Sequence, residues 1–339
     1  MPIDIDPRDV PVLLLYNLDP SWTVREREEV TAASSQLEQA ISAVGHPTTL
    51  VPLLSDEIAD ILRPYDPCSH IVFNWCESIP GVPHSEPLVA WNLELQDFVF
   101  TGASSAALTL SGDKYRVKRI LDETGIPTPE WRLYDEPKAD GWDIFPAIVK
   151  PVNEHGSEGI TRESVVKTEA ELLKRVAYLV ETYDQPALVE DFIDGREFHV
   201  SVWGNGQIEM LPPAEMDFSL FDEVEDRVCT YDSKFVPGSQ HYEDIEMILP
   251  APLNEDEMQT VEEICKAAYT AIGCRDYGRI DLRSRGGVYY VLDVNPNADI
   301  SQDASLSSAA EFAGYSYGET GSRIIRLAAK RHPVWGERR

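Results

Sequence analysis

Four polar residues near the C-terminal end of the chain have types and spacing that suit charge-based chemistry. In the segment YGRIDLRSRGGVYYVLDVNPN, residues 277–297, Arg279 and Asp281 stand two positions apart, as do Asp293 and Asn295. Such pairs share one face of a β-strand. Neighbouring carboxylates repel unless a cation or a hydrogen-bond donor compensates them, and oxygen ligands of this kind suit Mg²⁺. We predict a metal and anion site on this face; an ordinary solvated sheet face is the alternative.

A β-hairpin must position these four residues. Two β-rich runs flank the RGG of residues 285–287, a pattern typical of a short loop with glycine in the left-handed region. With a three-residue loop, Arg279 lies opposite Asp293 and Asp281 lies opposite Val291. The polar residues then share one face, and the apolar residues line the other. A two-residue loop would break this agreement, so we predict three.

The lysines are informative because the chain is strongly acidic. Its net charge is -30 with a pI near 4.5, which argues against nucleic acid or an anionic membrane as a partner. An acidic protein that binds a polyanion must place its few lysines at that anion. Lys114, Lys150 and Lys234 each stand beside a loop or a strand end, and a lysine ammonium neutralises a phosphate without demanding planar geometry.

Composition indicates a folded protein of more than one unit. The chain has 339 residues, of which 43% are hydrophobic. We see no membrane span and no export signal in it. Five cysteines without CxxC spacing indicate reduced thiols, so we expect a cytoplasmic protein.

The first hundred residues alternate between strand and helix patterns. Apolar runs at 10–16 and 70–75 are strands, and residues 25–44 form a helix between them. This order predicts a parallel sheet that helices cover. Ligands bind such sheets at the C-terminal strand ends, so residues 17–24 and 76–87 are candidate substrate loops. Plain connecting loops are an equally good interpretation.

A second set of candidate residues lies in the middle of the chain. The strand FPAIVK is followed by the loop NEHGSEG, residues 153–159, whose glycines could turn backbone N–H groups toward a phosphate. It is not a Walker loop, because no Gly-Lys-Ser/Thr follows. Glu190 and Glu197 flank the turn between two strands and could accept hydrogen bonds from an adenine amino group or a ribose. Taken singly, each of these residues is as well explained as surface.

Together, in order, these segments resemble the ATP-grasp ligases, and within them the D-alanine–D-alanine ligase family. The resemblance runs from about residue 98 to 331 and includes FTGASSAALTLSGDKYRVKRIL, PAIVKP, LVEDFIDGREFHV, TYDSKF, GRIDL and DVNPN. It implies an N-terminal α/β domain at 1–105 and two ATP-grasp domains, at 106–195 and 196–339, that hold ATP between two sheets. We expect a homodimer.

The resemblance also implies how the nucleotide is bound. Lys114 and Lys150 would contact its phosphates, and residues 153–159 would form a mobile loop whose Ser157 reaches the γ-phosphate. Adenine and ribose would be read by one further group of residues: Glu190 and the backbone of Asp191, Phe192 and Ile193 for adenine, and Glu197 for ribose.

For catalysis, the implied ligands of Mg²⁺, with Mn²⁺ as an alternative, are Asp281, Asp293 and Asn295. Lys234 and Arg279 would stabilise the transferred phosphoryl group and the tetrahedral oxyanion. ATP would convert a carboxylate to an acyl phosphate, which an amine attacks. A glutamate among Glu26, Glu28 and Glu29 would orient that amine, and the sequence does not choose among them.

This chain departs from the family pattern on the substrate side. Asp293 stands where the bridging metal ligand is usually glutamate. NPNADISQDAS replaces a Ser-Pro-Gly segment, and NWCESIPGVPHSEP replaces a His-Gly-rich loop. We therefore predict a carboxylate–amine ligase acting on small amino-acid-like substrates, with D-alanyl-D-alanine synthesis as one activity. The alternatives are a ligase for other amino acids or their conjugates in specialised metabolism, and a nucleotide-binding regulatory protein without turnover.

Overall fold

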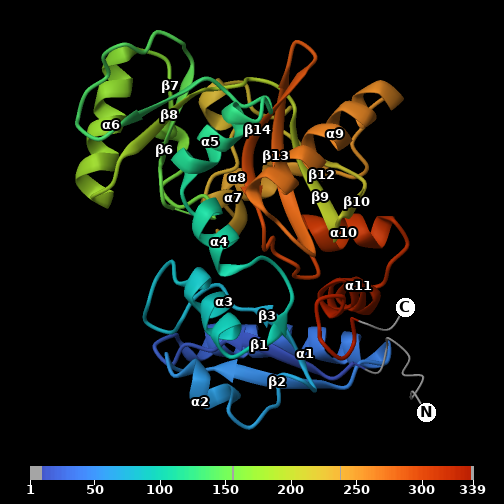
Figure 1. Cartoon of the computed structure of the whole chain (residues 1–339). Coiled ribbons are helices and arrows are strands. Elements are labelled where there is room, and N and C mark those ends of the chain that lie inside the picture. Colours follow the sequence, from blue (N-terminus) through green and yellow to red (C-terminus); the bar gives the residue numbers. More distant parts are fainter. Residues whose placement is uncertain (1–9, 155, 237, 337–339) are drawn as a thin grey trace.

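This computed structural model describes residues 10–154, 156–236 and 238–336, which form three β-sheets with helices on their faces (Figure 1). The first sheet has, in spatial order, β2 (Thr48–Leu53), β1 (Val12–Asn17), β3 (Ile71–Trp75) and β4 (Val99–Phe100). Its neighbouring strands are all parallel, which confirms the prediction. Helices α1 (Val24–Ala43) and α11 (Tyr317–Ala329) pack on one face, and α2 (Ile58–Leu62), α3 (Glu86–Leu95) and α4 (Ser105–Ser111) on the other.

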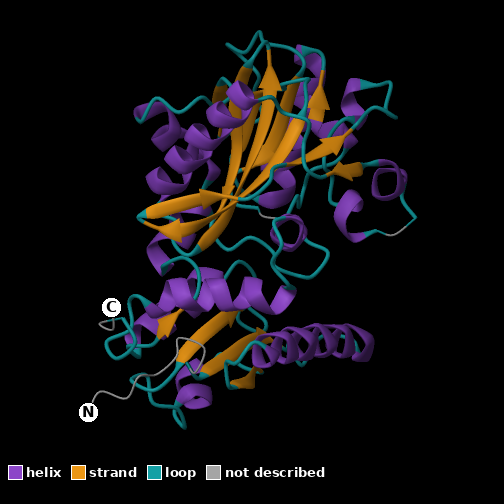
Figure 2. Cartoon of the chain, turned by 90° about the vertical axis from the view of Figure 1, so that its right-hand side faces the viewer, coloured by secondary structure: helices purple, strands orange, loops and turns teal. Residues whose placement is uncertain are grey.

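The helix α11 carries the end of the chain back to its beginning. It lies beside α1 in both views (Figures 1 and 2), and Ile324 of α11 and Ile41 of α1 share one core cluster. A Cβ on Gly321 would lie 2.7 Å from Ile41 Cγ1, and one on Gly318 would lie 2.1 Å from the Ala40 carbonyl oxygen, so the close packing requires glycine. The third predicted domain therefore contributes a helix to the first sheet. We keep the boundaries at 105 and 195 as a proposal.

The second sheet is antiparallel. Its spatial order is β5 (Trp131–Tyr134), β8 (Ala187–Asp191), β6 (Ala147–Pro151) and β7 (Val165–Val166). Helix α6 (Glu169–Tyr183) covers one face with Leu172 and Val176. Thr168 caps this helix by accepting a hydrogen bond from the Glu171 N–H, as its position predicts.

The third sheet is also antiparallel. Its strands are β12 (Glu246–Ile248), β11 (Ala214–Asp217), β9 (Glu197–Asn205), β13 (Tyr277–Arg285) and β14 (Val288–Asn295), with β10 (Gln207–Met210) paired to β9. A shared core joins it to α5 (Lys114–Glu123) and α9 (Glu255–Ile272). The remaining helices are α7 (Asp232–Phe235), α8 (Gln240–Asp244), α10 (Ser305–Phe312) and the short η2 (Arg162–Ser164) and η3 (Val224–Asp226).

Two results bear on the sequence interpretation. Residues 210–230 are polar and contain prolines, a pattern that does not assign them to helix or strand, and they contain β11 and η3. In the part of the chain that the structure describes, no helix is both long enough and apolar enough to cross a membrane.

Candidate functional site

A cavity lies between the second and third sheets. Its empty volume, which includes open solvent at the mouth, is about 790 Å³. Strands β6 and β8 form one wall, β9, β13 and β14 form the other, and the loop after β6 borders it. Ten of the predicted site residues line it: Lys114, Lys150, Ser157, Glu190, Asp191, Phe192, Ile193, Glu197, Asp281 and Asp293.

The first wall contains a buried carboxylate between two lysines. Glu190, 1% exposed, lies 3.0 Å from Lys150 Nζ and 3.3 Å from Lys118 Nζ. Burial opposes ionisation of Glu190, but the two ammonium groups outweigh it and lower its pKa. The carboxylate predicted to read adenine therefore also serves as counter-ion to two cations.

Sequence reasoning missed Lys118. It lies one helical turn after Lys114 on α5, where its ammonium donates to Thr128 Oγ1 at 2.7 Å and to the Val291 carbonyl oxygen at 3.3 Å. Burial lowers its pKa to about 8 despite the attraction of Glu190. The signal that could have found it is the i, i+4 spacing of the two lysines on a helix with an apolar face.

Lys114 and the loop after β6 close one end of the cavity. Lys114 Nζ donates a hydrogen bond to the Glu154 carbonyl oxygen, and burial lowers the pKa of this lysine. In the loop, Gly156, Ser157 and Gly159 have φ values of 62°, 67° and 72°. Left-handed backbone is uncommon at a serine, and such residues cluster at functional loops. The γ-phosphate role of Ser157 remains a proposal.

The second wall is the predicted hairpin, in a register that differs from our prediction. Its turn has two residues, Gly286 and Gly287, both with positive φ, so the three-residue loop is wrong. The sheet regains the one-sided arrangement through a β-bulge at Leu292, since the register shifts after Asp281. As a result Asp281 lies opposite Asp293, and Arg279 lies opposite Asn295.

These four hairpin residues lie together on one face, as predicted. Arg279 donates from Nε and Nη2 to the two Asp281 carboxylate oxygens, at 2.6 and 2.9 Å. Asn295 Nδ2 donates to Asp281 Oδ2 at 3.1 Å. Burial disfavours the charged guanidinium, but Asp281 outweighs this and raises the pKa of Arg279. Arg279 and Asn295 lie along the hairpin from the cavity, which Asp281 and Asp293 line.

The oxygen atoms of this face fit a hard divalent cation. Asp281 and Asp293 face each other across paired strands and border the same cavity, and the Asn295 amide contacts Asp281. Magnesium ion is usually held by one or two carboxylates and by substrate phosphates. The donor set therefore suits Mg²⁺.

A third ion pair lies at the start of β9. Arg283 Nε donates to Glu197 Oε2 at 2.7 Å, and its guanidinium lies 4.5 Å from the centre of the Phe192 ring. Burial opposes ionisation of Glu197, yet Arg283 and His199 hold its pKa at about 2. Arg283 Nη1 also donates to the Ile193 carbonyl oxygen at 3.0 Å. Arg283, which sequence reasoning missed, thus holds together three residues predicted to bind the nucleoside.

Two further predicted groups lie elsewhere. Lys234 belongs to α7, and its side chain lies outside the described part of the structure. Of the three N-terminal glutamates, Glu26 accepts from Thr23 in a capping box, and Glu29 pairs with Arg25 at 2.7 Å. Glu28 lines a separate hollow on α1.

Comparison with known proteins gives one consistent result. Residues 121–326 match the family described as D-ala D-ala ligase C-terminus. An uncharacterized protein of Sinorhizobium fredii is 32% identical over 86% of this chain and 86% of its own length. A D-alanine–D-alanine ligase of Marinomonas sp. is 32% identical over 70% of this chain and 71% of its own.

Solved structures agree on the fold. The crystal structure of a D-alanine–D-alanine ligase from Bacillus anthracis complexed with ATP superposes with a TM-score of 0.70 at 19% sequence identity. The match covers 95% of this chain and 98% of that one. This confirms the predicted arrangement of an N-terminal parallel-sheet unit followed by an ATP-grasp pair of sheets.

Proposed function

The chain belongs to the D-alanine–D-alanine ligase family, and on that basis we propose that it is an ATP-dependent ligase that joins a carboxylate to an amine and releases ADP and phosphate. One observation carries the proposal. The cavity between the two sheets has half-buried lysines on one side and a pair of facing aspartates on the other. A nucleotide that carries phosphates and a metal ion needs both kinds of group.

The reaction that fits these groups has two steps. The γ-phosphoryl group moves from ATP to an oxygen of the donor carboxylate, which yields ADP and an acyl phosphate. A neutral amine then attacks the carbonyl carbon, phosphate leaves with the bonding electrons, and the nitrogen gives up one proton, which the departing phosphate can accept. Neither step needs a nucleophilic side chain; both need positioning and charge neutralisation.

Lys114 and Lys150 bind the phosphates in this proposal, with Ser157 and Lys234 at the transferred group. Arg279, whose guanidinium pairs with Asp281, would stabilise the oxyanion of the second step. In this proposal adenine and ribose are held by Glu190, Asp191, Phe192, Ile193 and Glu197, and Arg283 fixes the last three of them.

Asp281, Asp293 and Asn295 would hold Mg²⁺, or Mn²⁺ in its place. The cation supplies charge neutralisation at the phosphate oxygens. Asp293 is one methylene shorter than glutamate, and the bulge beside it at Leu292 sets where its carboxylate enters the cavity.

Small amino-acid-like molecules are the proposed substrates, and D-alanine is the first to test. A second candidate, a ligase for other amino acids or conjugates, is favoured by the segment after the metal ligands. Between Pro296 and Ser322 the sequence has no Lys, Arg or His. This stretch therefore supplies no cation to bind the carboxylate of an amino acid that acts as the amine substrate. Glu26 caps α1 and Glu29 pairs with Arg25, whereas Glu28 lines a hollow. Glu28 is therefore the glutamate that we propose to orient the attacking amine.

We also propose a homodimer. Leu88, Trp91 and Leu95 lie on one side of α3 and are 46%, 50% and 61% exposed. An exposed apolar stripe of this kind suits a protein interface.

The test is ADP release with amino-acid pools, in which donor and acceptor are varied separately. We expect release above the ATPase background with at least one pair, and mass spectrometry should find the amide product. If ATP binds but no pair raises ADP or phosphate, the protein is a nucleotide-binding regulator and the ligase proposal fails. ATP binding is measured independently by displacement of a fluorescent ATP analogue.

A further inference from the structure

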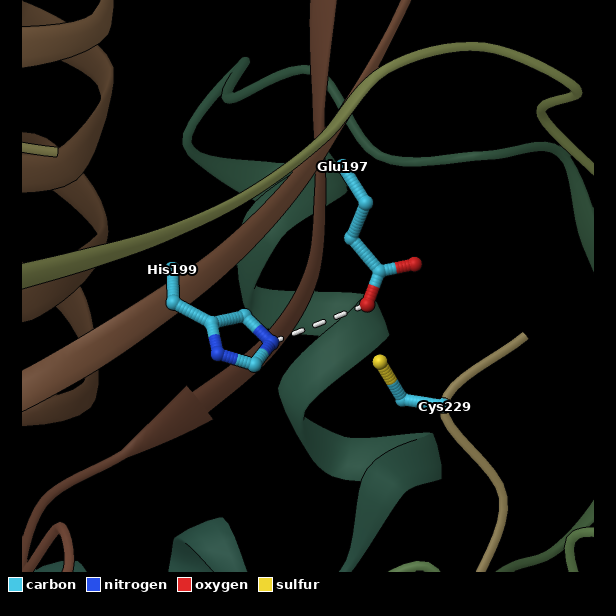
Figure 3. Close-up of side chains that lie close together, drawn as sticks. All are labelled: Glu197, His199 and Cys229. Carbon is cyan, nitrogen blue, oxygen red and sulfur yellow. Dashed lines mark ion pairs between the residues drawn. The ribbon is translucent and has the colours of Figure 1, made fainter. Parts of the chain in front are cut away.

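Three side chains with different ligand atoms converge beside the nucleoside end of the cavity. Glu197 and His199 are two residues apart on β9 and share a face, and Cys229 reaches them from the segment before α7 (Figure 3). One ligand atom from each, a carboxylate oxygen, a ring nitrogen and a sulfur, lies within 4.8 Å of the other two. The sequence reading assigned Glu197 to ribose and gave His199 and Cys229 no role.

Neighbouring residues fix the orientation of two of these groups. Ser305 Oγ lies 3.3 Å from His199 Nδ1, which leaves Nε2 directed at Glu197. Arg283 holds Glu197 Oε2 at 2.7 Å, which leaves Oε1 on the side of His199. Partners of this kind, which hold the far atom of a ligand, are typical of built metal sites.

The spacing suits a small tetrahedral ion. His199 Nε2 and Glu197 Oε1 lie 3.6 Å apart. Bonds of about 2.0–2.3 Å at tetrahedral angles put ligand atoms roughly 3.3–3.8 Å apart. Only a small movement of the Cys229 thiol would bring the third ligand to the same distance.

We propose that Glu197, His199 and Cys229 bind a thiophilic divalent metal of the Zn²⁺ type, with the fourth position open to the cavity. Nitrogen and sulfur ligands separate this site from the oxygen ligands of Asp281 and Asp293, which suit Mg²⁺.

The position of the site makes it inhibitory. Glu197 and Cys229 both line the cavity. A metal held between them would fill part of the space for the nucleoside and would bind the carboxylate that is proposed to contact the ribose. This consequence rests on the proposed function, whereas metal binding itself does not. Zn²⁺ would then lower ATP affinity, while Mg²⁺ would support turnover.

Metal binding is tested on the nucleotide-free protein with Zn²⁺ alone, in competition with a chromophoric chelator, and with Co²⁺ as a spectroscopic probe. We expect a single Zn²⁺ site and a thiolate-to-cobalt absorption band. His199→Gln and Cys229→Ser should weaken Zn²⁺ binding at least about tenfold, and Ser305→Ala, which keeps all three ligands, by about tenfold. Cys68→Ser, a change at an exposed cysteine, is the matched control and should have no effect.

Zn²⁺ affinity that is equal in the wild type, Cys229→Ser and Ser305→Ala overturns the proposal, as does a cobalt spectrum without the thiolate band. The second arm measures displacement of a fluorescent ATP analogue by Zn²⁺ in the wild type and in Cys229→Ser. Chelation of Zn²⁺ by the nucleotide is common to both proteins, so a difference between them reports the site. If Zn²⁺ binds but displacement is equal, the metal site stands and its overlap with the nucleotide is refuted.

Discussion

Replacing Glu86 with glutamine should stabilise the protein at alkaline pH. Glu86 begins α3, is half-buried, and accepts a hydrogen bond from Asn297 Nδ2 at 2.7 Å. Burial raises the pKa of this carboxyl, and Glu77 adds to the effect, so that it reaches about 7 although Asn297 opposes the shift. The folded protein thus bears an ionised carboxylate in a poor environment whenever the pH exceeds 7.

The sign and size follow from linkage. The carboxyl ionises near 4.5 when unfolded and near 7 when folded, so its contribution to stability is fully present below pH 4.5 and is lost as the pH rises through 7. At about 1.36 kcal/mol per pKa unit, the ceiling is about 3.4 kcal/mol. Partial solvation of the side chain reduces this, and we expect about 1–2 kcal/mol.

Urea unfolding of both proteins at about pH 4, below the unfolded-state pKa, and at about pH 8.5 measures this directly. Glu86→Gln keeps an oxygen that accepts from Asn297, and every other titrating group is common to both proteins. The gain in unfolding free energy should appear at the higher pH and nearly vanish at the lower. Glu123→Gln, at an exposed position on α5, should change stability by only a few tenths of a kcal/mol at either pH. An equal Glu86→Gln effect at both pH values would refute the reasoning.

Two further substitutions test the two walls of the cavity. Asp281→Asn should abolish Mg²⁺-dependent ADP release while circular dichroism shows an intact fold; turnover at the wild-type rate would contradict the metal assignment. Glu190→Gln leaves Lys118 and Lys150 buried without their shared carboxylate and should lower the unfolding free energy by about 3 kcal/mol. In a double-mutant cycle with Lys118→Met part of that cost should disappear, and strictly additive costs would mean that the pair is not coupled.

The face of the hairpin could be predicted because side-chain alternation depends only on local backbone geometry. Arg279 and Asp281 share a face in any strand, as do Asp293 and Asn295. The pairing between the two strands could not be predicted in the same way. It depends on the turn and on the bulge at Leu292, and the two-residue turn that we rejected is compatible with a one-sided polar face because the bulge inserts one residue.

Other features depended on contacts between distant segments. Lys118 and Glu190 are 72 positions apart in sequence, and only the packing of α5 against the second sheet makes them partners at 3.3 Å. The packing of α11 on the first sheet is of the same kind, since the glycines that permit it have no local signal as contact residues. Sequence reasoning thus located the residues of the cavity better than it located their partners.

Those partners explain how a protein of net charge -30 keeps a cluster of cations in one cavity. The cations in and beside the cavity are held by acceptors within the protein. Lys114 is held by the Glu154 carbonyl oxygen, Lys150 by Glu190 and Arg283 by Glu197, and Arg279, farther along the hairpin, is held by Asp281. A buried cation without such a partner would lower the stability of the fold, and so would a buried carboxylate without its cation. A phosphate that enters the cavity therefore replaces a carboxylate as the partner of a cation. The affinity of the protein for that phosphate depends on how many of the carboxylates a divalent cation can bind at the same time. On this argument ATP without a metal ion should bind weakly, because Asp281 and Asp293 would repel its phosphates.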